Sequence, residues 1–143
     1  MIKGECLCGA VQFEVASVVG PFELCHCNRC RKSSGSAYAA IVGVAVEGFR
    51  VTSGAKLIRS FEFPVVELPP GYRRFFCQNC GSPVPNPTPG GNWLGIPAGC
   101  LKQEPGLFPD KHIYVECKAG WDRVTDGLPQ FTKDQIRTLR KNN

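Results

Sequence analysis

"CQNCG", residues 77–81, contains two cysteines separated by two residues and followed directly by a glycine. Two thiols at this spacing in a tight turn can both be directed at one metal ion, and the glycine permits a backbone conformation that other residues resist. One such pair supplies half of a tetrahedral four-sulfur site. The stretch therefore predicts that a second pair of thiols lies elsewhere in the chain.

A second pair of closely spaced thiols lies near the N-terminus, in "CLC" at residues 6–8. If this segment is extended, Leu7 points to one face and the two cysteines to the other, so both sulfurs can reach one ion. We predict a closed four-thiolate metal site made of Cys6, Cys8, Cys77 and Cys80. Such a site has no position for a substrate, and its metal binding stabilises a fold by on the order of 10 kcal/mol. The alternative, unpaired buried thiols, is disfavoured by the two short spacings.

A third group of thiols is found in "CHCNRC", residues 25–30. Cys25, Cys27 and Cys30 have no protein partner of matching spacing, and a three-thiolate zinc site leaves one coordination position for water or a substrate. We predict that these residues form the catalytic site. Three thiolates give bound zinc a net negative charge, which makes the ion a weak activator of water. A substrate thiol, bound as thiolate, suits the fourth position better.

Three basic residues lie within or directly after this stretch: Arg29, Arg31 and Lys32. We predict that they offset the charge of the thiolates or bind carboxylates of the substrate. The alternative interpretation is a second closed structural site, completed by His26 or another residue. In an extended turn His26 would point away from the metal, which favours packing or a contact behind the ligands.

The other two cysteines, Cys100 and Cys117, stand alone in stretches with the pattern of strands. Isolated cysteines in such stretches are usually buried apolar thiols, and we predict that role for both. His112 opens the strand-like stretch "HIYVEC" and is expected to be a surface or packing histidine. None of the three is assigned to the chemistry.

The chain reads as mainly β. Alternation of apolar and polar residues predicts strands in four stretches, residues 10–16, 36–46, 56–63 and 72–77. In the first of these, Val11, Phe13 and Val15 share one face. Two further strands are expected at residues 92–101 and 111–117. A helix is expected only at 133–141, where Thr132 can cap it, and for a turn after Asn28.

Length and composition fit one globular domain over residues 1–143, with 43% apolar and 20% charged residues. The longest apolar stretch, at residues 37–46, is too short for a membrane-spanning helix, and the start of the chain lacks the pattern of a secretory signal. We therefore expect a cytoplasmic protein, in which nine cysteines point to metal binding or catalysis and not to disulfides. The net charge of +5 comes from scattered residues, which disfavours nucleic acid as a partner.

Four stretches together resemble the family of glutathione-dependent formaldehyde-activating enzymes, which includes the centromere protein V relatives. They are "GECLCGAVQFEV" at 4–15, "CHCNRCRKSSGSAY" at 25–38, "RRFFCQNCGSPV" at 73–84 and "HIYVECKAGWDRVTDGLPQF" at 112–131. The resemblance implies a β-tent fold of packed antiparallel sheets with two zinc ions. It places a structural zinc at Cys6, Cys8, Cys77 and Cys80, and a catalytic zinc at Cys25, Cys27 and Cys30.

The resemblance also implies a reaction and a partner. Members of the family condense formaldehyde with glutathione to S-hydroxymethylglutathione, which is classed as a carbon–sulfur lyase activity when written in reverse. We thus expect a zinc enzyme that acts on a glutathione adduct or a related thiol adduct. Two alternatives stay open at the level of sequence: a non-catalytic glutathione or thiol carrier, and a double-zinc structural module that binds another molecule.

Overall fold

The computed structural model describes residues 1–64 and 72–143, and it confirms a mainly β chain with a short C-terminal helix. The strands are β1 (Ile2–Glu5), β2 (Gln12–Val15), β3 (Val18–Cys25), β4 (Ala39–Ala45), β5 (Phe49–Ser53), β6 (Ile58–Phe63), β7 (Tyr72–Cys77), β8 (Trp93–Pro97), β9 (Lys111–Ile113) and β10 (Gln130–Phe131). The helices are α1 (Asn28–Ser34) and α2 (Lys133–Lys141). Short 3-10 turns cover Val46–Gly48, Ala55–Leu57, Ala98–Cys100 and Val115–Cys117.

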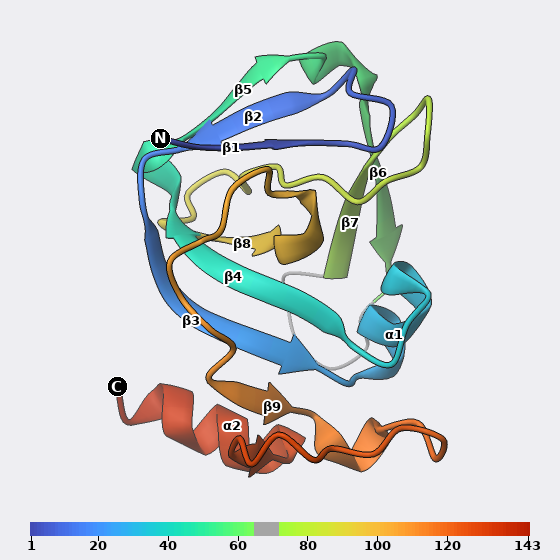
Figure 1. Cartoon of the computed structure of the whole chain (residues 1–143), viewed down its shortest axis with the longest axis vertical. Coiled ribbons are helices and arrows are strands. Elements are labelled where there is room, and N and C mark those ends of the chain that lie inside the picture. Colours follow the sequence, from blue (N-terminus) through green and yellow to red (C-terminus); the bar gives the residue numbers. More distant parts are fainter. Residues whose placement is uncertain (65–71) are drawn as a thin grey trace.

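The strands form three sheets, with orders β1-β2-β5, β10-β9-β3-β4-β8 and β6-β7 (Figure 1). Antiparallel pairing, as expected, joins most neighbours, but β9 runs parallel to both β3 and β10. The five-stranded sheet is therefore mixed. Its parallel part comes from the C-terminal segment, which returns to the free edge of β3 in the same direction as that strand.

The main core lies between the first and second sheets. It contains the buried apolar residues Phe13, Val15, Phe22, Leu24, Val42, Val44, Leu94 and Ile96. The inward face predicted for the first strand-like stretch is confirmed, because Val11, Phe13 and Val15 are all buried. In β3 the alternation continues, so that Phe22 and Leu24 enter this core while the residues between and after them face the other side.

Two predicted strands end earlier than their sequence pattern suggests. The stretch 111–117 is a strand only as far as Ile113, since Tyr114 adopts a left-handed backbone conformation (φ 57°) and a 3-10 turn follows. The stretch 92–101 likewise leaves the sheet after Pro97. Cys100 and Cys117 thus lie in turns, and the prediction of strands at these positions is wrong. Alternation is a local pattern, and it contains no information about where a neighbouring strand ends.

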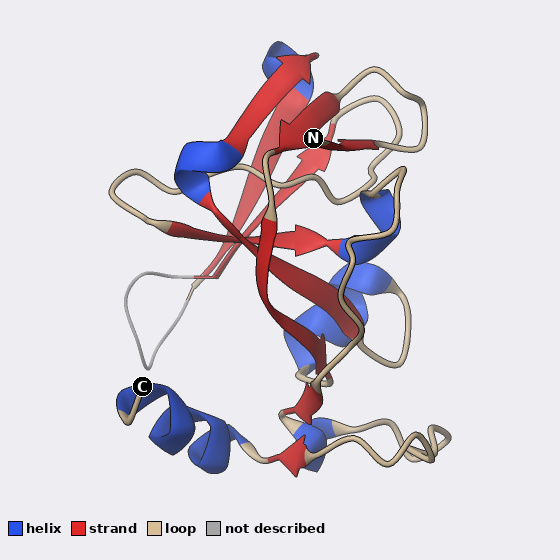
Figure 2. Cartoon of the chain, turned by 60° about the vertical axis from the view of Figure 1, so that its left-hand side comes forward, coloured by secondary structure: helices blue, strands red, loops and turns tan. Residues whose placement is uncertain are grey.

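Helix α2 begins where the sequence predicts. The Thr132 hydroxyl accepts a hydrogen bond from the backbone N–H of Gln135, whose side chain in turn accepts from the N–H of Thr132. One turn on, Ile136 is buried against Cys25, Cys27 and Ile113. Figures 1 and 2 place the helix at one end of the molecule, beside β9. Its apolar face therefore closes the end of the sheet at which β3 terminates.

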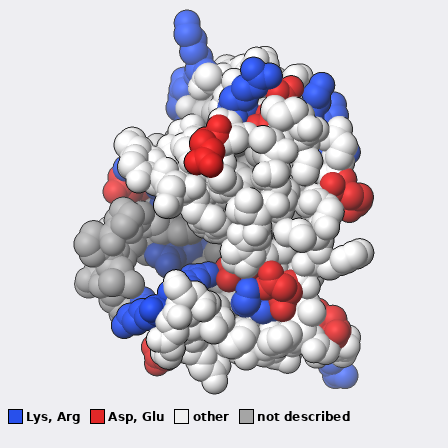
Figure 3. Space-filling view, turned by 90° about the vertical axis from the view of Figure 1, so that its left-hand side faces the viewer, with Lys and Arg blue, Asp and Glu red and all other residues white. Residues whose placement is uncertain are grey.

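Charged side chains stand at separate positions on the face of the molecule seen in Figure 3, with lysine and arginine interspersed among acidic and neutral residues. Within the described ranges, neither helix has the length and apolar character needed to cross a membrane.

Gly4 in β1 offers a test of how closely the first sheet packs. A Cβ atom at this position would lie 2.1 Å from the end of the Phe13 ring in the core. We expect Gly4→Ala to lower the free energy of unfolding by about 1–3 kcal/mol, because the ring has to leave its preferred position. Gly99→Ala is the matched control, since nothing lies within 4 Å of its added Cβ. Urea unfolding of both variants measures the difference, and equal stabilities would contradict the packing.

Candidate functional site

The first cluster of thiols brings together Cys6, Cys8, Cys77 and Cys80, whose sulfur atoms all lie within 4.8 Å of one another. The Cys6–Cys8 sulfur distance is 3.5 Å and the Cys8–Cys77 distance is 3.9 Å. Tetrahedral zinc with Zn–S bonds of about 2.3 Å needs sulfurs roughly 3.8 Å apart, so this cluster fits a metal of that kind. All four positions are supplied by the protein, which makes the site a closed one.

The local structure around these sulfurs explains the choice of residues. The segment after β1 is a turn and not the extended strand expected for "CLC", although Leu7 does point away and is 86% exposed. Gly81 has a φ of 74°, a left-handed conformation that favours glycine. Ser82 links the two turns, since its hydroxyl accepts from the N–H of Leu7 and bonds the Cys80 thiol, lowering the pKa of Cys80 to about 5.

The second cluster brings together Cys25, Cys27 and Cys30, again with all sulfurs within 4.8 Å. Cys25 ends β3, Cys27 is the N-cap of α1, and Cys30 lies in the first turn of that helix. The backbone N–H of Cys30 donates to the Cys27 sulfur at 3.3 Å, so the capping bond also orients a ligand. The strand-to-helix junction therefore gathers three thiols without help from any distant segment.

Mutual hydrogen bonding divides the charge unequally among these three thiols. Bonds from the Cys25 and Cys30 thiols hold the pKa of Cys27 well below its usual range. The same contacts raise the pKa of Cys25, through Cys27, and the pKa of Cys30, through Cys25 and Cys27. Without a cation the cluster thus favours one thiolate that its neighbours solvate. A bound divalent metal would supply the charge that lets all three ionise, which is the fit expected of a metal site.

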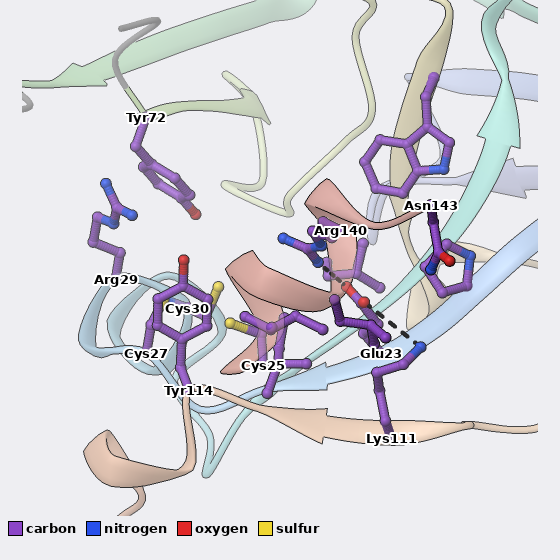
Figure 4. Close-up of a pocket in the computed structure, with 16 residues that line it drawn as sticks. Glu23, Cys25, Cys27, Arg29, Cys30, Tyr72, Lys111, Tyr114, Arg140 and Asn143 are labelled. Carbon is purple, nitrogen blue, oxygen red and sulfur yellow. Dashed lines mark hydrogen bonds and ion pairs between the residues drawn. The ribbon is translucent and has the colours of Figure 1, made fainter. Parts of the chain in front are cut away.

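A cavity of about 810 Å³ opens onto the second cluster. Figure 4 shows the three cysteines in its middle, with Arg29 and Tyr72 on one side and Glu23, Lys111 and Arg140 on the other. Tyr114, Trp93 and Leu139 also line the cavity. Its size lies within the range of pockets that bind small molecules. The cluster for which the described residues supply three ligands is therefore the one that a small molecule can reach.

His26 lies behind the three-cysteine cluster and is not one of its potential metal ligands. It is fully buried (0% exposed), and its Nε2 lies 2.8 Å from Nδ1 of His112, whose Nε2 bonds Asp126 Oδ2 at 2.8 Å. Burial lowers the pKa of His26, and the neighbouring His112 adds to the effect. The predicted packing role of His26 agrees with this position. His112 is buried as well, so a surface position for it is excluded.

Of the three basic residues predicted near the site, the structure places one in the cavity and two outside it. Arg29 lines the cavity, and its guanidinium carbon lies 4.9 Å from the centre of the Tyr72 ring. Arg31 instead donates to the backbone carbonyl of Cys117 at 3.0 Å and lies with Lys32 along a separate shallow groove. Of the three, Arg29 is placed to meet a ligand in the cavity.

Comparison with known proteins places this geometry in a family. The model of the family described as "Glutathione-dependent formaldehyde-activating enzyme" matches residues 1–117, which include both thiol clusters. The chain belongs to this family. A protein of Halomonas elongata named "Putative glutathione-dependent formaldehyde-activating enzyme" is 34% identical over 127 residues, covering 87% of this chain and 81% of the relative. The resemblance stated from sequence, and with it the expectation of an enzyme, is confirmed.

A solved structure of a Rhodobacter sphaeroides protein shares the fold of this family member. The two superpose with a TM-score of 0.56 at 22% identity, over 91% of this chain and 99% of the other. At this level of identity the similarity concerns the arrangement of the chain. It supports the architecture that carries the two clusters.

Several residues that line the cavity were not identified from the sequence. They are Glu23, Tyr72, Lys111, Tyr114 and Arg140. For Glu23 a signal was present, because a residue two positions before Cys25 on one strand shares its face. The others come from separate segments that only the folded chain brings together. Cys100 and Cys117 lie outside both clusters, and the Cys100 thiol donates to the carbonyl of Pro83.

Replacement of single cysteines distinguishes the roles of the two clusters. We expect Cys80→Ser to lose one metal ion per chain and several kcal/mol of stability, because the closed site joins distant segments. Cys30→Ser should lose one ion as well but cost less stability, since its ligands are already close along the chain. Metal analysis combined with denaturant unfolding measures both effects.

Cys117→Ser is the control for these variants, because Cys117 is part of neither cluster, and it should keep the full metal content. The assignment of a structural and an open site would be contradicted if Cys30→Ser proved as unstable as Cys80→Ser.

Proposed function

We propose that both clusters bind zinc, one ion in the closed four-sulfur site and one in the three-sulfur site, and that the second ion is the catalytic one. The proposed reaction is the addition of glutathione to formaldehyde to give S-hydroxymethylglutathione, or its reverse. One observation carries this proposal: in a chain of this family, the cluster with only three protein sulfurs opens into a cavity of about 810 Å³. We expect the protein to work in the cytoplasm, where thiols stay reduced.

The charge of the three-sulfur site supports a thiol as the ligand. Zinc, when bound by three thiolates, would take up a substrate thiol as thiolate and keep it nucleophilic at neutral pH. Water would be activated poorly at such an electron-rich ion. The substrate thiol gives up its proton on binding, and the hydroxyl group of the product gains one. The net reaction is therefore a simple addition that forms one carbon–sulfur bond and requires no oxidant or reductant.

Tyr114 is the residue best placed to assist the aldehyde. Its side chain lines the cavity beside the three cysteines (Figure 4). A left-handed backbone conformation is uncommon for a bulky residue and is held here between β9 and the following 3-10 turn. A phenol in this position can donate a hydrogen bond to the aldehyde oxygen as that oxygen gains negative charge. It can thus both orient the aldehyde and help protonate the product.

Cobalt substitution provides the main test of the proposed function. Glutathione should change the visible absorption of the cobalt protein, because a fourth sulfur joins the open site, and the zinc protein should accelerate the formation of S-hydroxymethylglutathione as followed by NMR. A spectrum that no thiol alters would exclude an open thiol site. Binding without acceleration would instead identify a thiol carrier.

Tyr114→Phe tests the assistance to the aldehyde. Removal of one hydrogen bond to a developing oxyanion should lower kcat by about 10- to 100-fold, while glutathione affinity and metal content stay unchanged. Tyr38→Phe is the matched control, because Tyr38 packs on the ring of His26 and does not line the cavity. An unchanged kcat in Tyr114→Phe would remove this residue from the mechanism.

A further inference from the structure

Glu23 is a buried carboxylate on the wall of the catalytic cavity. It is 6% exposed, although glutamate is rarely buried in proteins unless it is paired. Glu23 precedes Cys25 by two residues on β3, so the two side chains share one face, with Cβ atoms about 7 Å apart. Phe22 and Leu24 fill the core on the opposite face. The strand thus presents a thiol and a carboxylate together to whatever occupies the cavity.

Two cations from separate elements meet this carboxylate. Arg140 of α2 bonds it at 2.7 Å, and Lys111 of β9, which also bonds the carboxylate of Asp110, lies 3.8 Å from its other oxygen (Figure 4). Arg140 is half exposed, and a guanidinium has five N–H donors, of which the contact with Glu23 engages only part. The donors of Arg140 that Glu23 does not engage can therefore bind a second carboxylate, with the Lys111 ammonium close by. Glu23 itself can accept hydrogen bonds from an ammonium group of the ligand.

This group of charges matches the zwitterionic end of an amino acid better than it matches a simple anion or cation. A ligand with a lone carboxylate would be attracted by the cations but repelled by Glu23. A ligand with a lone ammonium group would be attracted by Glu23 but repelled by the cations. A ligand that carries an α-amino group beside an α-carboxylate satisfies both signs at once. Because the groups lie in a partly enclosed cavity, such charge-assisted hydrogen bonds are stronger than on an open surface.

The opposite side of the cavity offers a different charge. Arg29 stacks against Tyr72 there and lies on the far side of the cysteines from Glu23 (Figure 4). No acidic residue is among the described side chains that line this side of the cavity, so it suits a lone carboxylate. The cavity thus presents a zwitterion-binding end, a sulfur-binding middle and an anion-binding end.

We propose that Glu23, Lys111 and Arg140 bind the α-amino and α-carboxylate groups of the γ-glutamyl residue of glutathione, and that Arg29 binds the carboxylate of its glycine. The inference rests on the proposed function and adds the orientation of the thiol substrate. The γ-glutamyl subsite depends on α2, whose residues follow the segment 1–117 that the family model matches. Recognition of this end of the thiol therefore requires the C-terminal segment, through Arg140, in addition to Glu23 and Lys111.

Truncated thiols test the orientation when their affinities are measured through the absorption of the cobalt-substituted protein. Cysteinylglycine lacks the γ-glutamyl group, and γ-glutamylcysteine lacks the glycine. Arg140→Gln should weaken glutathione and γ-glutamylcysteine by about tenfold or more and leave cysteinylglycine unchanged, because only the first two thiols carry the zwitterionic end. Arg29→Gln should weaken glutathione and cysteinylglycine but not γ-glutamylcysteine.

Lys141→Gln is the matched control, because it removes a neighbouring positive charge from the same helix outside the cavity, and it should leave all three affinities unchanged. Glu23→Gln provides a second measurement. It should reduce the preference for glutathione over N-acetylglutathione, in which the α-amino group is no longer charged. In the Arg140→Gln and Glu23→Gln variants, unchanged cysteinylglycine binding shows that the cavity is still folded.

The possible failures are distinguishable. If Arg140→Gln weakens all three thiols equally, the ion pair with Glu23 only positions α2, and the subsite is refuted. If Arg140→Gln behaves like Lys141→Gln, the subsite is refuted as well, while normal thiol binding by the unmodified protein leaves the proposed function intact. If no thiol alters the spectrum of the unmodified cobalt protein, the proposed function and the subsite both fail.

Discussion

The convergence of four sulfurs at Cys6, Cys8, Cys77 and Cys80 is the interaction on which the rest of the structure depends. Two of these thiols come from the turn after β1, one from the last residue of β7 and one from the turn that follows β7, so that Cys8 and Cys77 meet across 69 positions of the chain. The apolar contacts around them form only a small cluster with Val11 and Val84. A metal ion at this point would replace a larger core and hold the β6–β7 hairpin to the first sheet.

The second constraint is the alternation of strand β3. One face of this strand inserts Phe22 and Leu24 into the main core, and the other presents Glu23 and Cys25 to the cavity. A shift of register by one residue would exchange the two faces and place the carboxylate and the thiol in the core. The pairing of β3 with β4 on one edge and β9 on the other thus fixes the site as firmly as it fixes the core.

The charge of the open cluster is complementary to the charges of the side chains around it. The thiolate of the open cluster and a buried glutamate concentrate negative charge, and Arg29, Lys111 and Arg140 surround it from three different elements. The positions of these cations, on opposite sides of the sulfurs, leave room for a ligand that carries charge at both ends. The same arrangement accounts for the position of α2, whose Ile136 is buried against the cluster, whose Arg140 pairs with Glu23, and which forms part of the cavity wall.

The sequence by itself determined both thiol clusters, the buried face of the first strand-like stretch, and helix α2 with its Thr132 cap. Each of these depends on spacing within a few residues, so the side chains that cooperate are neighbours along the chain or belong to recognisable pairs. Only the tertiary structure decided the parallel pairing of β9, the left-handed conformation of Tyr114 and the meeting of Glu23 with Arg140, which lie 117 positions apart. These features follow from where the C-terminal segment returns to the edge of β3. Local periodicity carries no information about such a return, because it describes which face a residue occupies and not which distant segment that face will meet.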